Sequence, residues 1–189
     1  MKSFTLIEIL VVISLISILT IFVVPNFHLA NSRIAVERAA YKLARDIRNA
    51  EEMSVSSRKT SFSKFNSTLF PSGGYGLSFT GSVNSYILFA DCNNDGKYDE
   101  TSGAPSCAVA GPGSTYPEKI EEIFLEPGIV IKKPSSHILD SITFFPPDPL
   151  IVMKPNPNSN PGIELTSTID SSKSVVVSVN EAGLIEIKH

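Results

Sequence analysis

Hydrophobic and polar positions divide the chain into three parts with different periodicities. From Phe4 to Val24 nearly every residue is apolar, and Glu8 is the only charged one. Between residues 36 and 50, apolar residues recur at spacings of four, three, four and three, as on one face of a helix. After residue 57, short β-leaning runs alternate with turn clusters. The pattern predicts a long N-terminal helix followed by a β-rich body.

The first part has the composition of a membrane span, since roughly 20 apolar residues cross a bilayer as a helix. Lys2 precedes the run, on the side expected to stay in the cytoplasm. A secretory signal peptide has an apolar run of about 7–15 residues and then a small-residue cleavage site, whereas this run is longer and ends in "VVPNF". A simple anchor would do better without Glu8, because a carboxylate inside a transmembrane helix costs on the order of 3 kcal/mol.

The second part predicts an amphipathic helix that ends near Ser56. Two hypotheses account for its apolar stripe: a dimeric coiled coil, or packing against a sheet of the same chain. About two heptads are regular, which is short for a coiled coil, so packing on the sheet is favoured. Together the two parts make a helix of about 50 residues, roughly 75–80 Å long at 1.5 Å per residue. The stripe consists of Val36, Ala40, Leu43, Ile47 and Ala50.

The third part contains short runs with the composition of strands. The last two runs are joined by "NEAG", a good hairpin turn. The proline-rich segment "PPDPLIVMKPNPNSNPG" is predicted to be an ordered surface loop. The predicted strands are 60–65, 74–79, 85–90, 121–126, 128–133, 141–145, 163–168, 174–179 and 184–188.

Composition and charge narrow the class of function. The 189 residues carry a net charge of −3, so no basic excess favours nucleic-acid binding. The two cysteines are too few for a disulfide-dense scaffold and lack the spacing of a zinc site. Motifs of hydrolases, metalloproteases, P-loops and dinucleotide-binding folds do not occur, so an enzyme is not predicted.

The segment "SFTLIEILVVISLISILTIFVVPNF" resembles the N-terminus of type IV prepilins and type II secretion pseudopilins. The shared motif runs from Phe4 to Glu8 without a gap, and Pro25 stands where the helix of that family usually kinks. The resemblance implies cleavage between Ser3 and Phe4 by a membrane aspartyl peptidase and N-methylation of Phe4. It also implies that Glu8 meets the Phe4 amine of a neighbouring subunit during assembly. The family nearly always has glycine before the cut, where this chain has Ser3.

Two segments of the body, "SYILFADCNNDGKYDE" and "SVVVSVNEAGLIEIK", resemble the GspH/FimT branch of minor pseudopilins and minor pilins. The implied fold is α+β: a long N-terminal helix, half membrane-spanning and half amphipathic, packed on a C-terminal antiparallel β-rich head. The expected parts are a leader peptide at 1–3, a transmembrane half at 4–27, an amphipathic half at 28–56 and a globular head at 57–189.

The resemblance implies a structural subunit, minor and near the tip or the initiation point, of a type II secretion pseudopilus or a type IV pilus. The implied partners are other pilin or pseudopilin subunits, the prepilin peptidase and N-methyltransferase, and the inner-membrane assembly platform. The implied location is the bacterial cytoplasmic membrane, with the N-terminus in the cytoplasm and the head outside, and then the filament. The alternative is a membrane-anchored extracytoplasmic binding module that does not polymerise.

The stretch "DCNNDGKYDE" contains the first half of a calcium-binding loop. Asp91, Asn93 and Asp95 alternate ahead of a glycine, and Asp99 stands at the ninth position. The twelfth position, which should supply a bidentate glutamate, is Ser102. A polar turn stabilised by Asx hydrogen bonds is the favoured alternative. Calcium remains the one candidate cofactor.

Cys92 and Cys107 flank this acidic loop. A head outside the cytoplasm is in a compartment where disulfides persist, so a bond between them is favoured over two buried thiols. It would close a loop of about 15 residues and stabilise the fold by roughly 3 kcal/mol in the chain-entropy model.

Overall fold

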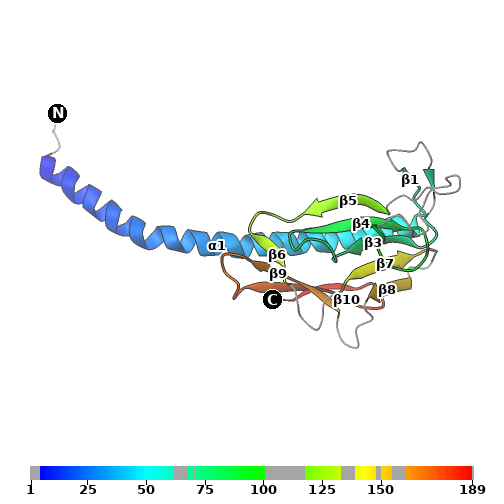
Figure 1. Ribbon diagram of the computed structural model, residues 1–189. Coiled ribbons are helices and arrows are strands. Elements are labelled where there is room, and N and C mark those ends of the chain that lie inside the picture. The colour runs from blue at the N-terminus through cyan, green and yellow to red at the C-terminus, as the bar shows by residue number, and fades with distance from the viewer. Residues whose placement is uncertain are drawn as a thin grey trace.

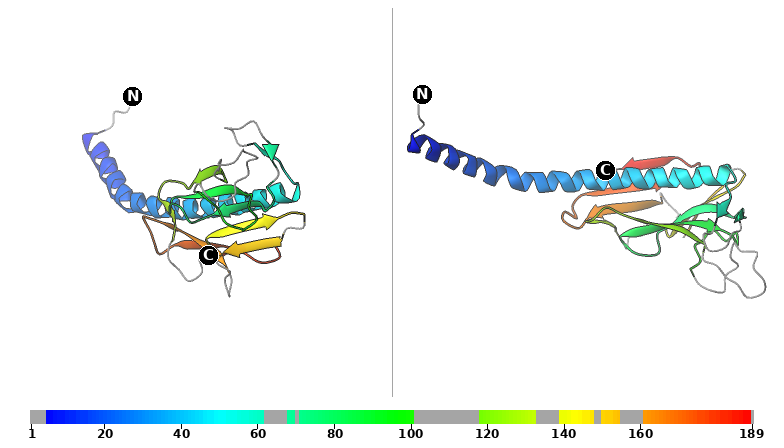
Figure 2. Two further views of the ribbon diagram at one scale, coloured as in Figure 1. Left: turned by 45° about the vertical axis from the view of Figure 1, so that its right-hand side comes forward. Right: turned by 90° about the horizontal axis from the view of Figure 1, so that it is seen from above.

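Helix α1 (Leu6–Val55) is the longest element and runs for 50 residues. The computed structural model describes residues 5–61, 68–69, 71–100, 118–132, 139–147, 150–154 and 161–188, with backbone alone at 22–30, 60–61 and 68–69. The N-terminal part of α1 is curved and projects beyond the strands, whereas its C-terminal part lies along them (Figures 1 and 2). Its side chains are thus described in two stretches, Leu6–Ile21 and Asn31–Val55.

The predicted fold class is wrong in its membrane-spanning half. In the described part of the chain, no helix combines the length and the apolar character that a membrane crossing requires. The long membrane helix packed on a β-domain is therefore replaced by two unlike stretches of α1, and it is Asn31–Val55 that packs on the antiparallel sheets.

Short antiparallel strands form three sheets in the described residues. The strands are β1 (Thr60–Ser61), β2 (Thr68–Leu69), β3 (Gly74–Ser78), β4 (Ser85–Asp91), β5 (Lys119–Phe124), β6 (Ile129–Ile131), β7 (Ser141–Phe145), β8 (Leu150–Lys154), β9 (Gly162–Ser167), β10 (Ser174–Val179) and β11 (Ile185–Lys188). The largest sheet has the order β5-β4-β3-β7-β8, and the second has the order β11-β10-β9-β6. The third is the pair β1-β2.

The predicted apolar stripe of α1 lies at the centre of the core. Each of its five side chains is at most 1% exposed. The stripe shares one hydrophobic cluster with Leu77 and Phe144 of the five-stranded sheet and with Leu165 and Val177 of the four-stranded sheet. The hypothesis that the stripe packs on the chain's own sheets is confirmed, and the coiled-coil hypothesis is wrong.

Strand β8 lies inside the segment that was predicted to be a loop. Strands β7 and β10 coincide with predicted ranges, whereas the run Leu150–Lys154 was missed because prolines stand on both sides of it. Its residues pair with β7 from Ser141↔Lys154 to Phe145↔Leu150, at the edge of the sheet. Proline disrupts a ladder from within, but these prolines flank the strand and leave its pairing intact.

Candidate assembly surface

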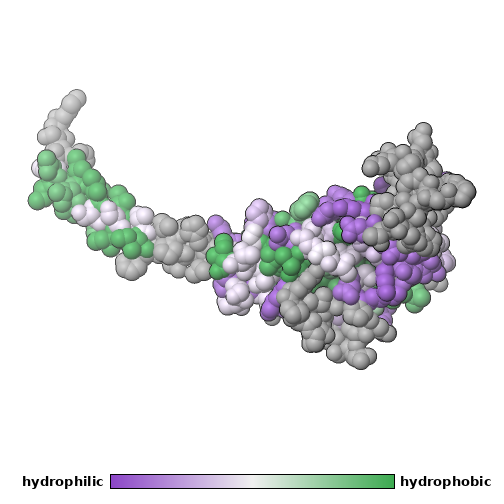
Figure 3. All heavy atoms as spheres, viewed as in Figure 1, coloured by the Kyte–Doolittle hydropathy of each residue, from purple (hydrophilic) through white to green (hydrophobic). Residues whose placement is uncertain are grey.

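The first stretch of α1, Leu6–Ile21, exposes apolar side chains on all sides. Its leucine, isoleucine and valine residues are between 51% and 82% exposed. Figure 3 shows this hydrophobic region at the far end of the molecule, away from the largely hydrophilic head. Soluble proteins rarely expose a continuous apolar area of this kind unless it contacts a partner, and a helix that is apolar all round is normally buried. The stretch therefore has the character of a contact surface.

The polar side chains of this stretch find their hydrogen-bond partners within it. The Ser14 and Ser17 hydroxyls donate to the carbonyl oxygens of Leu10 and Ile13, at 2.8 and 2.9 Å. The Thr20 hydroxyl donates in the same way to the carbonyl four residues earlier, at 2.8 Å. Because these donors are already bonded, the stretch presents apolar groups to its surroundings.

Glu8 has partners at the start of the helix. Its Oε2 accepts hydrogen bonds from the backbone N–H and from the hydroxyl of Thr5, each at 2.9 Å. This carboxylate occupies the third helical position and accepts from the backbone N–H of the N-cap residue, as in a capping box. The spacing Thr5-x-x-Glu8 is a helix-start pattern, so the sequence contained a signal that would have predicted this bond.

Several predicted residues lie where the structure gives little or no description. Ser3, Phe4 and the leader at 1–3 are outside the described residues, so cleavage, methylation and the pairing of Glu8 with a neighbour's amine stay predictions. Pro25 lies within α1, in the part whose backbone alone is described.

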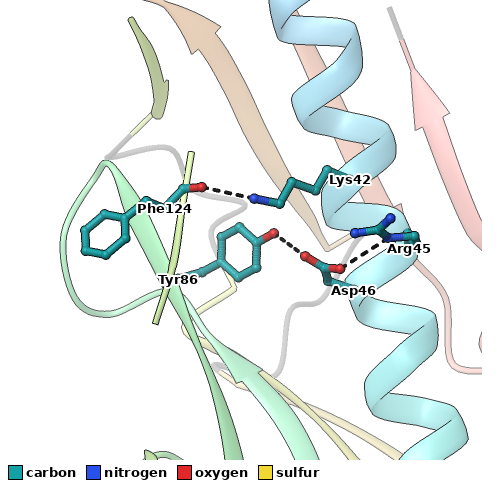
Figure 4. Close-up of polar contacts among 5 residues, drawn as sticks. All are labelled: Lys42, Arg45, Asp46, Tyr86 and Phe124. Carbon is teal, nitrogen blue, oxygen red and sulfur yellow. Dashed lines mark hydrogen bonds and ion pairs between the residues drawn. The ribbon is translucent and has the colours of Figure 1, made fainter. Parts of the chain in front are cut away.

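A set of polar contacts fixes the second stretch of α1 against the five-stranded sheet (Figure 4). The hydroxyl of Tyr86, which is 1% exposed, donates to Asp46 Oδ2 at 2.7 Å. Lys42 Nζ donates to the carbonyl oxygen of Phe124 at 3.2 Å, and Arg45 lies 3.6 Å from Asp46. Burial and then the Asp46 carboxylate raise the pKa of Tyr86 well above its ordinary value. The tyrosine thus remains a donor at any physiological pH and holds α1 in one register.

The acidic loop after β4 is organised by buried Asp91. Its Oδ1 accepts from the backbone N–H of Asn94 and its Oδ2 from that of Gly96, both at 2.7 Å. Asn94 and Gly96 have φ values of 64° and 72°, a region that asparagine and glycine tolerate best. Burial raises the pKa of Asp91, and the N–H groups it accepts oppose that shift. The loop is therefore folded around a carboxylate of its own.

Glu118, a residue that the sequence did not single out, ties the two ends of this loop together. Its Oε1 accepts from the backbone N–H of Cys92 at 3.0 Å, and its Oε2 accepts from that of Asp99 at 3.1 Å. The side chain is 1% exposed, and burial raises its pKa to about 7. The contact bridges 26 positions of sequence, so no local pattern indicated it.

The predicted calcium ligands are engaged with the loop itself. Asn93 Oδ1 accepts from the N–H of Asp95 at 3.1 Å, and Asn93 Nδ2 donates to Asp99 Oδ2 at 2.7 Å. Asp95 Oδ1 accepts from the N–H of Lys97 at 2.8 Å. Across the described segments, no cluster of three or more His, Cys, Asp or Glu residues could hold a metal ion. The contacts are those of the Asx-stabilised turn, and calcium binding stays a prediction.

Cys92 takes part in a disulfide bond. Its predicted partner, Cys107, lies outside the described residues. The backbone N–H of Cys92 is held by Glu118, so the same position joins the loop to a buried carboxylate and to the disulfide.

Comparisons of the chain with known protein families, with curated proteins and with solved structures gave no match.

Proposed function

We propose that the chain is a non-enzymatic structural subunit of a filament of the pilin or pseudopilin type, and that it assembles through Leu6–Ile21 of α1. The exposure of this all-round apolar stretch is the observation that carries the proposal. Removing apolar area from water stabilises a contact by about 25 cal/mol per Å². Helices of the same kind on neighbouring subunits would provide that burial.

The packing of the head supports a role in assembly for the first stretch of α1. The core of the head is built from the second stretch of α1 and the two larger sheets, and it contains no side chain from Leu6–Ile21. The first stretch is therefore available for contacts between subunits. The motif from Phe4 to Glu8 supports processing at Ser3–Phe4.

The proposed partners follow from the same motif. They are other pilin or pseudopilin subunits, the prepilin peptidase and N-methyltransferase, and the inner-membrane assembly platform. The likeness of the acidic loop and the last hairpin to the GspH/FimT branch supports a minor subunit at or near the tip, with the filament as its final location.

The test replaces apolar side chains in the first stretch of the full chain. Ile13→Gln with Ile16→Gln should abolish recovery of the protein in sheared filaments from the source cells. The matched control, Ile169→Gln, changes an isoleucine of the head that is 72% exposed and should leave recovery unchanged. Normal incorporation of the double variant would contradict the proposal and favour an anchored module that does not polymerise.

Mass spectrometry of assembled protein tests the processing step. The expected N-terminus is methylated Phe4, and an intact Met1 in assembled material would contradict cleavage at Ser3–Phe4.

A further inference from the structure

A cavity of about 330 Å³ lies between the end of α1 and the start of β3. Apolar side chains form much of its described wall, and the polar ones come from the last turn of α1 and the residues just after it. Binding sites for small molecules begin at about this volume and combine an apolar wall with a few polar groups. We name it the helix-end pocket; its described lining includes Ser54, Ser57, Arg58, Pro71, Tyr75 and Pro146.

Ser57 adopts a backbone conformation that is unusual for serine. It follows the C-cap residue Ser56 and has a φ value of 47°. Its N–H donates to the carbonyl of Ser54, and that of Arg58 donates to the carbonyl of Met53, both at 3.0 Å, which is the Schellman ending of a helix. Glycine is the ordinary residue at this position because it has no Cβ. A strained serine beside a cavity points to a role in binding, since such outliers gather at ligand sites.

Ser54 supplies a buried hydroxyl to the same pocket. The residue is 1% exposed, and its Oγ accepts the backbone N–H of Tyr75 at 2.8 Å. Among the described residues, no acceptor takes the hydrogen of this hydroxyl, whereas the Ser14 hydroxyl donates to its own helix. A buried hydroxyl with an unused hydrogen favours a ligand that brings an acceptor.

Arg58 is exposed and is the one charged residue in the described lining. Its side chain forms no ion pair with any other residue that the structure describes. Its carbonyl accepts the Tyr75 hydroxyl, which fixes its backbone against β3. The carbonyl end of a helix disfavours an anion, but here the carbonyls of Glu52, Met53 and Ser54 already accept N–H groups. The guanidinium is therefore available to a negative ligand.

We propose that the helix-end pocket binds a carboxylate that carries a short apolar body. The Arg58 guanidinium holds the carboxylate oxygens, and the Ser54 and Ser57 hydroxyls donate to the same group. The proline rings and the ring of Tyr75 contact the apolar body. A free carboxylic acid and the C-terminal residue of a peptide share this chemistry. The pocket belongs to the head and lies outside Leu6–Ile21, so it goes beyond the proposed filament contact.

Titration of the full chain with benzoate, in detergent micelles, tests the site. We expect saturable changes in the backbone amide NMR signals of Ser57, Arg58 and Tyr75, with a Kd on the order of 1 mM. Benzamide has the same ring and no charge, so it should bind about tenfold more weakly. Equal binding of the two probes, or no saturable change with benzoate, would overturn the proposal.

Two variants separate binding from stability. Arg58→Gln should weaken benzoate binding about tenfold, because hydrogen bonds to charged groups are the stronger ones. Its matched control, Arg48→Gln, removes a charge from an exposed position of α1 outside the described lining and should leave binding unchanged. Ser57→Gly should weaken binding and leave thermal stability nearly unchanged, because relief of strain offsets the greater freedom of glycine in the unfolded chain. Unaltered binding by both pocket variants would contradict the assignment.

A short peptide that ends in phenylalanine distinguishes the two sources of the carboxylate. If the peptide with a free C-terminal carboxylate binds more tightly than benzoate and its C-terminal amide does not, the pocket takes the end of a chain. If benzoate binds and the peptide binds no more tightly, the pocket takes a free acid. Binding of neither probe overturns the proposal.

Discussion

The two described stretches of α1 have the same helical backbone geometry but place their apolar side chains in opposite environments. Leu6–Ile21 keeps its polar groups bonded within the helix and presents apolar side chains outward. Asn31–Val55 buries an apolar stripe under two sheets and presents charged side chains outward. One helix thus carries a stretch whose apolar stripe is buried against the chain's own sheets and another whose apolar side chains remain exposed. Substitutions that are severe in the second stretch should therefore be mild for folding in the first.

The largest expected difference comes from truncating leucines in the two stretches. Leu43→Ala removes a side chain that is fully buried and should cost about 2–5 kcal/mol of unfolding free energy. Leu15→Ala acts on a side chain that is 56% exposed and should leave that free energy unchanged within about 0.5 kcal/mol. Urea unfolding of the full chain in detergent measures both. Equal losses would show that the first stretch belongs to the folding unit of the head.

The pH dependence of unfolding should also distinguish the head from the first stretch of α1. Glu118 has its pKa raised to about 7 in the folded head, against an ordinary value near 4.5, so the folded state binds the proton more tightly. Its contribution is present below pH 4.5 and is lost as pH rises through 7, about 3 kcal/mol in all. Glu118→Gln should flatten this slope in urea unfolding between pH 5 and 8. The double variant Ile13→Gln and Ile16→Gln should keep it, and a changed slope there would mean that the first stretch influences the loop.

A smaller effect should follow from the contact that fixes α1 in register. Tyr86→Phe removes the donor to Asp46 and leaves a partly buried carboxylate with one bond fewer, at a cost of about 1–3 kcal/mol. Asp46→Asn keeps an acceptor for the tyrosine and should cost less. Thermal unfolding compares the two, and a larger loss for Asp46→Asn would contradict the assignment of the hydrogen bond.

The smallest effect is expected at the exposed ion pair of the second stretch. Arg33 lies 3.3 Å from Glu37, one helical turn away, and Arg33→Ala should change stability by about 0.5 kcal/mol or less. The same urea titration measures it. A loss above about 1 kcal/mol would show that this end of the stretch contributes packing as well as charge.

The sequence predicted those features that arise from local periodicity. The stripe from Val36 to Ala50 and the strands β7 and β10 follow from spacings of 3.6 and 2 residues, which burial imposes directly. Strand β8 was missed because the prolines on both sides of its short apolar run predicted a loop. Its pairing with β7 forms only in the folded sheet and leaves no local pattern in the sequence. The membrane-spanning prediction was made from the length and hydropathy of a run in the sequence, and no helix in the described part of the chain meets both requirements.

The contacts of Glu8 and of the acidic loop were predicted only in part. Glu8 was singled out as a charge in an apolar run, but its bond to Thr5 was missed although the helix-start pattern was present. The turn around Asp91 was predicted from its Asx and glycine residues. Glu118 could not be predicted, because its role depends on the pairing of β4 with β5, which brings distant segments together.

The hydroxyl bonds of Ser14, Ser17 and Thr20 have a mechanical consequence. Since these groups donate to their own helix, a neighbouring helix that touches α1 at these three positions can shift without breaking their hydrogen bonds. An assembly held together in this way would yield elastically under tension and recover, while its heads determine how far each subunit can turn.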